Sequence, residues 1–528
     1  MTQRILISDP LAQQGIDILE EEKSFKVDVK VKLPPEELKK IIKDYDALII
    51  RSQTKVTKEI IESADKLKVI GRAGVGLDNV DIPEASKKGI IVMNAPMGNT
   101  ISTAEHAFSL LLSLARNIAQ ADSSLKGGKW ERKKFMGVEV YGKTLGIIGL
   151  GRIGKEVARR AMSFQMKVMA YDPFLSNEKA EELGIESVNL DRLFREADYI
   201  TIHTPLTNDT KGLIGKDTIS LMKKSVRIVN CARGGIVNES DLLEAVKSGR
   251  IAGAALDVYE KEPPLGSEIL TSEKIVTTPH LGASTEEAQV NVAIDVARSI
   301  KDALLDKGIR NAVNVPSVDQ EVLKAMRPYL ELAEKMGQMQ AQLIEGFVKR
   351  VKITYVGEIV NQNLNALTLS IIKGLLSPIL EEKVNNVNAM VIARERGITI
   401  SERKTEEVKD FAHLIHVAVE TNKMTNTLTG TLLMKNSPRI IRVNNFYVEA
   451  IPKGHMLVID NEDAPGIVGH IGTILGNEKI NIAGMTFGRD KKGGNAITLL
   501  NVDSEVPKNL LEKMKKAKNI RDVKYVKL

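Results

Sequence analysis

Residues 144–154, TLGIIGLGRIG, decide the fold, because an apolar and β-rich run there ends at three glycines. The residues that follow, 155–162 (KEVARRAM), are predicted to form a helix. Gly149, Gly151 and Gly154 therefore lie at a strand-to-helix turn, the context that the GxGxxG dinucleotide fingerprint requires. Gly149 permits the tight turn, Gly151 lets a pyrophosphate approach the backbone, and Gly154 lets helix and strand pack closely. Free N–H groups at the start of the helix favour the phosphates.

An acidic residue follows at the spacing of a ribose-binding group. The apolar run 167–171 ends at Asp172, and such a group is expected about 20 residues beyond the glycines. A carboxylate there accepts hydrogen bonds from the ribose hydroxyls and repels a 2′-phosphate, so the sequence predicts NAD rather than NADP. The alternative, a loop of glycines with an unrelated surface aspartate, does not explain the combination of strand, glycines, helix and Asp172.

A second glycine cluster, 71–76 (GRAGVG), follows the apolar run 68–70. It lacks the third glycine and a clear following helix, so it is not a second fingerprint. We interpret it as a loop at a domain interface, with Arg72 and Val75 facing the site. A plain turn is the open alternative on this local pattern.

Three later residues can assist a bound NAD in the oxidation of a hydroxy acid. This reaction needs a cation for the carboxylate, a base for the hydroxyl proton and a group that holds the base. Arg233 follows the strand-like run 226–229, and its planar guanidinium binds carboxylate bidentately. His280 follows the run 274–277, and histidine titrates near neutrality. Glu262 can hold the imidazole and raise its pKa. Ordinary loop and surface roles stay open for all three, because spacing does not show that they converge.

The run from residue 143 to 282 resembles the D-isomer-specific 2-hydroxyacid dehydrogenases. The resemblance implies that Arg233 orients the substrate carboxylate, that Glu262 supports the histidine and that His280 is the acid–base. It also implies NAD contacts along the strand ends. Taken with the fingerprint, the predicted cofactor residues are Gly149, Gly151, Arg152, Ile153, Gly154, Asp172, Thr204, Cys231, Ala232, Asp257 and Val75.

Segments within the first hundred residues indicate which branch of that family the chain resembles. Arg51 follows the apolar run 47–50, and the segments 71–81 (GRAGVGLDNVD) and 94–99 (NAPMGN) come next. They resemble the D-3-phosphoglycerate dehydrogenases, a branch of that family. The resemblance implies D-3-phosphoglycerate as substrate, with contacts at Arg51, Arg72, Gly74 and Asn99. A doubly anionic phosphoester needs such donors, whereas a hydroxy acid without phosphate does not.

The last part of the chain, 456–528, is predicted to run β-α-β-β-α-β. It resembles an ACT domain, a ferredoxin-like module that binds amino acids between paired copies. The resemblance implies L-serine as an effector, with contacts at Asp463 and Asn481. Asn461 stands where the family often has His or Tyr, and a dimerising sheet without a ligand is the alternative.

The predicted fold class is α/β, with two Rossmann-like lobes followed by an α+β intervening domain and the ACT domain. We expect a split substrate lobe (1–98 and 283–316), an NAD-binding domain (99–282), an intervening regulatory or assembly domain (317–453) and the ACT domain (454–528). A helical run over 103–120 should leave the first lobe, and one over 285–305 should return to it. The cleft between the lobes is the expected active site.

Composition excludes other classes of function. At 528 residues, the chain is too long for one core. Its 75 basic residues are offset by 68 acidic ones, and no basic run is interleaved with aromatics, so no nucleic-acid partner is expected. One cysteine excludes intrachain disulfides and a cysteine-rich metal site, and no metal is predicted. The start, 1–7, is predicted as a strand rather than a signal peptide, and no apolar run is long enough for a membrane span. We expect a cytoplasmic homo-oligomer, and the resemblance implies a tetramer.

Two other functions stay open. A glyoxylate or hydroxypyruvate reductase shares the same Arg, Glu and His, although it gives no reason for Arg51, Arg72 or the ACT tail. Some members of the superfamily act as NAD-sensing corepressors, which bind NADH tightly, turn over slowly and bind partner peptides.

Overall fold

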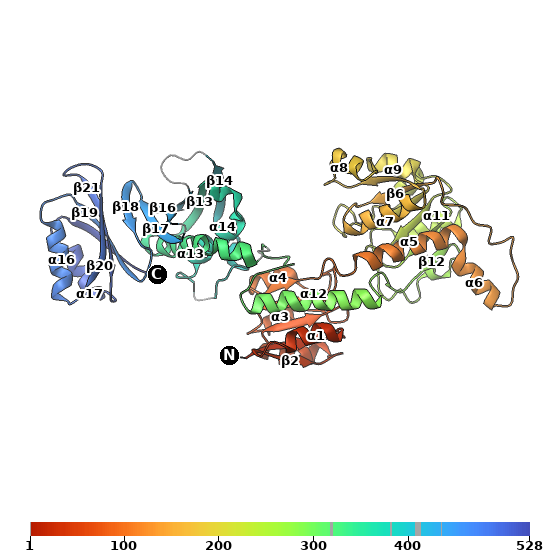
Figure 1. Ribbon diagram of the computed structural model, residues 1–528, viewed down its shortest axis with the longest axis horizontal. Helices are drawn as coiled ribbons and strands as arrows, with labels where there is room; N and C mark the ends of the chain where they lie inside the picture. The colour runs from red at the N-terminus through yellow and green to blue at the C-terminus, as the bar shows by residue number, and fades with distance from the viewer. Residues whose placement is uncertain (1, 317–319, 381–382, 407–412, 435) are drawn as a thin grey trace.

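The computed structural model describes residues 2–316, 320–380, 383–406, 413–434 and 436–528. Residues 1 and 317–319, at the starts of the predicted first lobe and intervening domain, lie outside this part of the chain. Within it the strands form four sheets, two parallel, one mixed and one antiparallel. Figure 1 shows them spread along the long axis of the molecule, with the C-terminal sheet at one end. The predicted fold class is confirmed.

The first sheet is parallel, with strand order β2-β1-β3-β4-β5. Its apolar strands are covered by helices on both faces, as parallel sheets require. The helix predicted over 285–305 is α12 (Glu286–Leu304), and it packs on this sheet: a Cβ on Gly71 would lie 2.6 Å from Val296. Residues far apart in sequence thus share one core. The elements are β1 (Gln3–Ile7), α1 (Gln13–Glu20), β2 (Phe25–Val29), α2 (Pro35–Ile41), β3 (Ala47–Ile50), α3 (Lys58–Glu62), β4 (Val69–Arg72), α4 (Ile82–Lys87) and β5 (Ile91–Met93).

The second sheet is also parallel, with strand order β12-β11-β10-β9-β6-β7-β8. The order reverses between β6 and β9, and ligands of such sheets bind at the carboxyl ends of the strands beside this switch point. The elements are β6 (Thr144–Ile148), α7 (Arg152–Ser163), β7 (Lys167–Tyr171), α8 (Asn177–Glu182), β8 (Glu186–Ser187), α9 (Leu190–Glu196), β9 (Tyr199–Ile202), α10 (Lys216–Leu221), β10 (Arg227–Asn230), α11 (Glu239–Lys247), β11 (Gly253–Leu256) and β12 (Ile275–Thr277).

The connection between these sheets differs from the prediction. The single helical run expected over 103–120 is two helices, α5 (Thr100–Arg116) and α6 (Ile118–Lys126). Asn117 between them has φ 53°, in the left-handed region that ends a helix and that asparagine tolerates better than most residues. The prediction of one helix was therefore wrong at this residue. α5 itself packs against α7 and the second sheet.

The two C-terminal sheets share a hydrophobic core. The mixed sheet has the order β14-β13-β15-β16-β17-β18, and the antiparallel sheet has the order β20-β21-β19-β22. Buried side chains of the long helix α13 and of β19 and β22 belong to one cluster. The last six elements follow the predicted β-α-β-β-α-β pattern. The elements are α13 (Gln320–Leu343), β13 (Val348–Gly357), α14 (Leu364–Leu376), α15 (Ala389–Glu395), β14 (Thr399–Thr405), β15 (His413–Thr421), β16 (Thr425–Leu433), β17 (Ser437–Val443), β18 (Phe446–Ala450), β19 (His455–Glu462), α16 (Ile467–Asn477), β20 (Ile482–Arg489), β21 (Asn495–Val502), α17 (Lys508–Lys515) and β22 (Ile520–Lys527).

Among the described residues, no helix combines the length and the apolar character needed to cross a membrane.

Candidate active site

The glycine loop has the shape of a phosphate cradle. Gly149 has φ 92°, and a Cβ there would lie 2.7 Å from the His203 carbonyl oxygen. A Cβ on Gly154 would lie 2.2 Å from the Gly149 carbonyl oxygen, so helix and strand approach as the fingerprint predicts. Gly151, in contrast, faces open space. It is the N-cap of α7 and provides no side-chain cap, so the first N–H groups of the helix stay available to an anion. These residues fit a dinucleotide pyrophosphate.

Asp172 lies beside this loop, at the end of β7. One carboxylate oxygen accepts a hydrogen bond from the Leu150 N–H at 2.8 Å, and the other accepts one from the Phe174 N–H at 2.9 Å. The predicted ribose-binding residue therefore also fixes the glycine loop. Thr204 follows β9, and its backbone nitrogen lies 3.1 Å from the position of a Cβ on Gly149.

The end of β10 places Cys231, Ala232 and Arg233 at the same edge of the sheet. The buried side chain of Asn230 fixes their turn, because it accepts a hydrogen bond from the Ala232 N–H at 3.0 Å and donates one to the Arg233 carbonyl at 2.9 Å. The Arg233 guanidinium pairs with Asp78 of the first lobe at 3.1 Å. Arg233 is therefore held between the two lobes.

Glu262 and His280 form a hydrogen-bonded pair. The distance from Nδ1 of His280 to Oε2 of Glu262 is 2.8 Å. This hydrogen bond raises the pKa of His280 above its ordinary value of 6.5, although burial and the charge of Arg233 act in the opposite direction. Burial disfavours the charged form of Glu262, yet the bond to His280 leaves its pKa lowered on balance. The pair therefore leaves Nε2 of a basic imidazole for a proton transfer, with Arg233 close enough to influence it.

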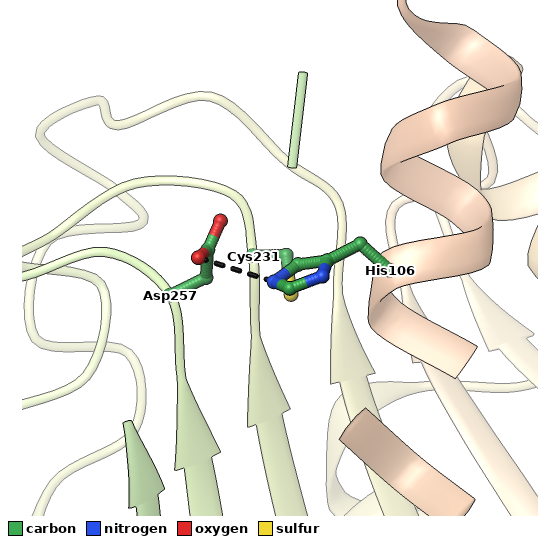
Figure 2. Close-up of side chains that lie close together, drawn as sticks. All are labelled: His106, Cys231 and Asp257. Atoms are coloured by element: carbon green, nitrogen blue, oxygen red, sulfur yellow. Dashed lines mark ion pairs between the residues drawn. The ribbon is translucent and has the colours of Figure 1, made fainter. Parts of the chain in front are cut away.

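Asp257 is buried next to this pair, at the end of β11. It accepts hydrogen bonds from the Thr278 hydroxyl (2.6 Å), the Leu281 N–H (2.7 Å) and the Gly282 N–H (2.9 Å). Figure 2 shows His106 of α5 pointing at the carboxylate from the other side, with Cys231 beside the ring. The atoms of His106, Cys231 and Asp257 that could ligate a metal lie within 4.8 Å of one another. Hydrogen bonds already occupy both oxygens of Asp257, so the cluster is accounted for as a polar network.

Three arginines lie close enough to influence one another. The pKa of Arg72 is lowered to about 10, first by burial and then by the charge of Arg233, and Arg51 also contributes. Burial lowers the pKa of Arg51 as well. A Cβ on Gly74 would lie 2.4 Å from Nη1 of Arg72, so Gly74 leaves the room that this guanidinium occupies. Cations this close to one another favour a multiply charged anion between them.

Two polar atoms of the site await a partner. Nε of Arg51, a donor, and Oδ1 of Asn99, an acceptor, are buried and have no hydrogen-bond partner among the residues that the structure describes. The loop that carries Arg72 is tied to the segment before Asn99 by the bond from the Asn94 side chain to the Val75 carbonyl, at 2.6 Å.

The contacts of three further predicted cofactor residues are with other parts of the protein. They are Val75, Arg152 and Ile153. The exposed guanidinium of Arg152, in the first turn of α7, lies 3.2 Å from the sulfur of Met97 in the first lobe. Ile153 packs against the apolar core beside α7, and Val75 follows Gly74 in the loop of the first lobe. Their contacts with a cofactor stay a prediction.

The predicted effector residues do not meet within one chain. Asp463 accepts hydrogen bonds from Arg489 at 2.8 Å and from the Gly493 N–H at 2.9 Å. Asn481 donates to Asp503 at 2.6 Å. Asn481 directly precedes β20 and Arg489 ends it, so the two predicted residues lie at opposite ends of that strand, roughly 25 Å apart. A site that uses both requires a second copy of the chain.

Sequence reasoning missed four polar residues of the site. Asp9 accepts from the Arg51 N–H at 2.6 Å, and Asn79 accepts from Nε of Arg72 at 3.1 Å. Asp78 pairs with Arg233, and His106 with Asp257. Asp78 and Asn79 lie inside the quoted segment 71–81, so that segment held a signal. Nothing local distinguishes His106 from other polar residues of a helix.

Known families match three parts of the chain. Residues 108–282 match the family described as D-isomer specific 2-hydroxyacid dehydrogenase, NAD binding domain. Residues 325–444 match the D-3-phosphoglycerate dehydrogenase intervening domain, and residues 455–519 match the ACT domain. The order of these matches agrees with the order of the sheets.

Curated relatives match along almost the whole chain. The chain is 47% identical over 528 residues to a D-3-phosphoglycerate dehydrogenase of Archaeoglobus fulgidus, covering 99% of this chain and 100% of that protein. It is 42% identical to a D-3-phosphoglycerate dehydrogenase of Bacillus subtilis, covering 99% of both.

Solved structures match the two N-terminal lobes. Apo D-lactate dehydrogenase from Escherichia coli is 27% identical with a TM-score of 0.53, covering 59% of this chain and 100% of that one. A glyoxylate reductase from Paecilomyes thermophila is 28% identical with a TM-score of 0.55, covering 59% of this chain and 98% of that one. Since the full-length relatives also share the two C-terminal parts, the chain belongs to the D-3-phosphoglycerate dehydrogenase family of NAD-binding 2-hydroxyacid dehydrogenases.

Proposed function

We propose that the chain oxidises D-3-phosphoglycerate with NAD to 3-phosphohydroxypyruvate, the first step of the phosphorylated route to L-serine. The observation that carries the proposal is the convergence of Arg51, Arg72 and Arg233 beside the paired Glu262 and His280. The site offers separate cations for a carboxylate and a phosphate and one base for a hydroxyl. A reductase of small oxo acids leaves Arg51 and Arg72 without a role.

Each side chain has one task in this reaction. Arg233 binds the carboxylate and the C2 oxygen, exchanging its bond to Asp78 for the substrate. Arg51, Arg72 and Asn99 hold the phosphate end. Nε2 of His280 takes the proton from the C2 hydroxyl while Glu262 stabilises the imidazolium through Nδ1. Bound NAD would supply the acceptor for the hydride that leaves C2. Closure of the cleft excludes water from the reacting atoms.

The remaining predicted residues hold the cofactor. The N–H groups at the start of α7 face the pyrophosphate, and the open space above Gly151 admits it. Asp172 accepts from the ribose hydroxyls, while Thr204, Cys231, Ala232, Asp257 and Val75 line the path from the ribose to the nicotinamide. We keep the division into lobes 1–98 with 283–316 and 99–282, followed by 317–453 and 454–528, as part of the proposal. The shared core of β4 and α12 supports it.

Replacing Arg72 by methionine tests the substrate directly. We expect kcat/KM for D-3-phosphoglycerate to fall by about 100-fold, because charge-assisted bonds to the phosphate are lost. For D-glycerate, which lacks that phosphate, kcat/KM should change by much less. The matched control is Lys68→Met. Lys68 directly precedes β4, at the opposite end of that strand from Arg72, and its exposed side chain pairs with Asp46. Equal losses for both substrates would contradict a phosphate role for Arg72.

The pH dependence of the reaction should follow the pair Glu262 and His280. Oxidation needs the neutral imidazole, so kcat/KM should fall as pH drops through the raised pKa of His280, while the reverse reduction should gain. Glu262→Gln removes the charge that raises this pKa, so the pH at which kcat/KM falls should be lower than in the wild type. The measurement is kcat/KM against pH in both directions, with Glu260→Gln as control. If kcat/KM of Glu262→Gln falls at the same pH as that of the wild type, the result would contradict the pairing of Glu262 with His280.

We further propose that L-serine inhibits by binding between paired ACT domains. β20 is an edge strand that pairs with β21 alone among the described strands, and Met485 near its middle is exposed. Antiparallel pairing of two β20 strands brings Asn481 of one copy to the Asp463 end of the other. This arrangement joins two residues that one chain keeps apart. Bound serine then biases the closure of the cleft.

Asn481→Ala should raise the serine concentration for half inhibition by about tenfold or more, because a hydrogen bond to the ligand is lost. Asp463→Ala should do the same from the other copy. Asn477→Ala, an exposed position at the end of α16, is the matched control. The measurement is initial rate against serine concentration for each variant. Unchanged half inhibition in both would place any serine site elsewhere.

A second self-association surface supports a homo-oligomer. Large apolar side chains are exposed along α6 and the segment after it, namely Ile118, Leu125, Trp130, Met136 and Tyr141. An exposed apolar surface of this kind marks a protein interface. Two different twofold interfaces, here and at β20, generate a closed tetramer.

We also propose a cytoplasmic setting, which suits the free thiol of Cys231.

A further inference from the structure

Helix α5 carries two side chains that reach the segment bearing His280. The helix starts at Thr100, directly after the first lobe, and packs against the second sheet, so it joins the lobes. The Thr103 hydroxyl donates to the Gly282 carbonyl at 3.0 Å. Nε2 of His106 lies 3.1 Å from Oδ1 of Asp257 and 3.2 Å from the Thr278 hydroxyl. Of the five residues in these contacts, only Asp257 is a proposed cofactor residue.

The donors and acceptors around Nε2 show which nitrogen of His106 carries a hydrogen. The Thr278 hydroxyl donates its single hydrogen to Asp257 at 2.6 Å, so its oxygen is left to accept. The carboxylate of Asp257 only accepts. Both neighbours of Nε2 are therefore acceptors, and His106 must carry a hydrogen on Nε2 and donate it to them. Figure 2 shows the His106 ring directed at the Asp257 carboxylate.

The network fixes the backbone on both sides of His280. Asp257 binds Thr278 before it, and Leu281 and Gly282 after it. His280 itself has φ 57°, a left-handed conformation that costs free energy in residues other than glycine and persists only where the surroundings impose it. The direction of the His280 ring therefore depends on how firmly Asp257 is held, and His106 is its side-chain donor from α5.

We propose that His106 is a positioning residue for the acid–base step, which couples helix α5 to His280 through Asp257 and Thr278. The inference rests on the proposed function only in taking His280 as the acid–base. It adds that the helix joining the lobes controls the orientation of that histidine. Movement of the lobes and alignment of the base are thereby linked by one hydrogen-bonded side chain.

The test compares His106→Leu with His106→Gln, whose amide nitrogen can replace Nε2. In His106→Leu we expect kcat to fall by about 10-fold to 100-fold, because the base is misaligned. KM for the substrate and the Kd for NADH by fluorescence titration should change by much less than kcat, because the Leu281 and Gly282 N–H groups still donate to Asp257. The melting temperature is measured to show that the variant is folded. His106→Gln should restore most of kcat. Ser109→Leu, an exposed position one turn further along α5, is the matched control.

Three results would overturn the proposal. An unchanged kcat in His106→Leu would show that the contact does not position the base. A loss of NADH affinity as large as the loss of kcat would make His106 a cofactor-site residue. If kcat/KM of His106→Leu no longer fell at low pH, His106 would be the proton carrier. Failure of the proposed function is distinguished separately, since the wild-type protein would then not oxidise D-3-phosphoglycerate at all.

Discussion

Replacing His280 by asparagine is expected to lower kcat for D-3-phosphoglycerate oxidation by about 1,000-fold, within the range that acid–base groups contribute. Asparagine is the informative choice because it tolerates the left-handed backbone of residue 280, where φ is 57°, and its amide can still donate to Glu262. It lacks only the nitrogen that accepts the proton. The loss therefore reports the chemistry and not the fold. The measurement is kcat under saturating substrate and NAD, with the melting temperature alongside.

Two companions complete this experiment. His280→Ala should show the same loss in kcat and an additional small loss of stability, because alanine is strained in that conformation. His470→Ala, at an exposed position on α16, should keep normal turnover. A kcat of His280→Asn within a few fold of wild type would refute the assigned base.

Arg233→Met should be comparably severe, with kcat/KM reduced by about 1,000-fold. The guanidinium provides bidentate bonds to the carboxylate and stabilises charge on the C2 oxygen, and both are lost together. Arg233→Lys should recover only part of the rate, because an ammonium lacks the planar fork. The measurement is kcat and KM separately for the three proteins.

Arg159→Met is the matched control for Arg233, since Arg159 is exposed on α7 and pairs with Glu156 outside the cleft. The Arg233 variants also test the contact with Asp78. If that contact alone mattered, Asp78→Asn would reproduce the loss seen in Arg233→Met, and the assignment of the carboxylate to Arg233 would be wrong.

Much of the fold was predictable because its signals are local. The glycines of 149–154 obey steric limits that leave few other residues possible, and the structure shows the same limits at Gly149 and Gly154. The alternation of apolar strands and helices over the first lobes predicted two parallel sheets, and the C-terminal pattern predicted the antiparallel one. Arg233, Glu262 and His280 follow or lie near strand ends, which a parallel sheet gathers at one edge.

Other parts were not predictable because they depend on contacts between distant residues. No local pattern shows that His106 meets Asp257, 151 positions later in the chain, or that Asp78 pairs with Arg233 across the cleft. The break at Asn117 depends on one backbone angle that many asparagines do not adopt. The separation of Asp463 from Asn481 follows from strand register, which sequence spacing alone does not give.

The measurement that tests the central claim most directly is NAD reduction by the purified protein at alkaline pH, with D-3-phosphoglycerate and with D-glycerate. Because Arg51, Arg72 and Arg233 lie close to one another, kcat/KM for the phosphorylated acid should exceed that for D-glycerate by about 100-fold or more. A protein that ignores D-3-phosphoglycerate, yet binds NADH and reduces glyoxylate or hydroxypyruvate, would contradict it.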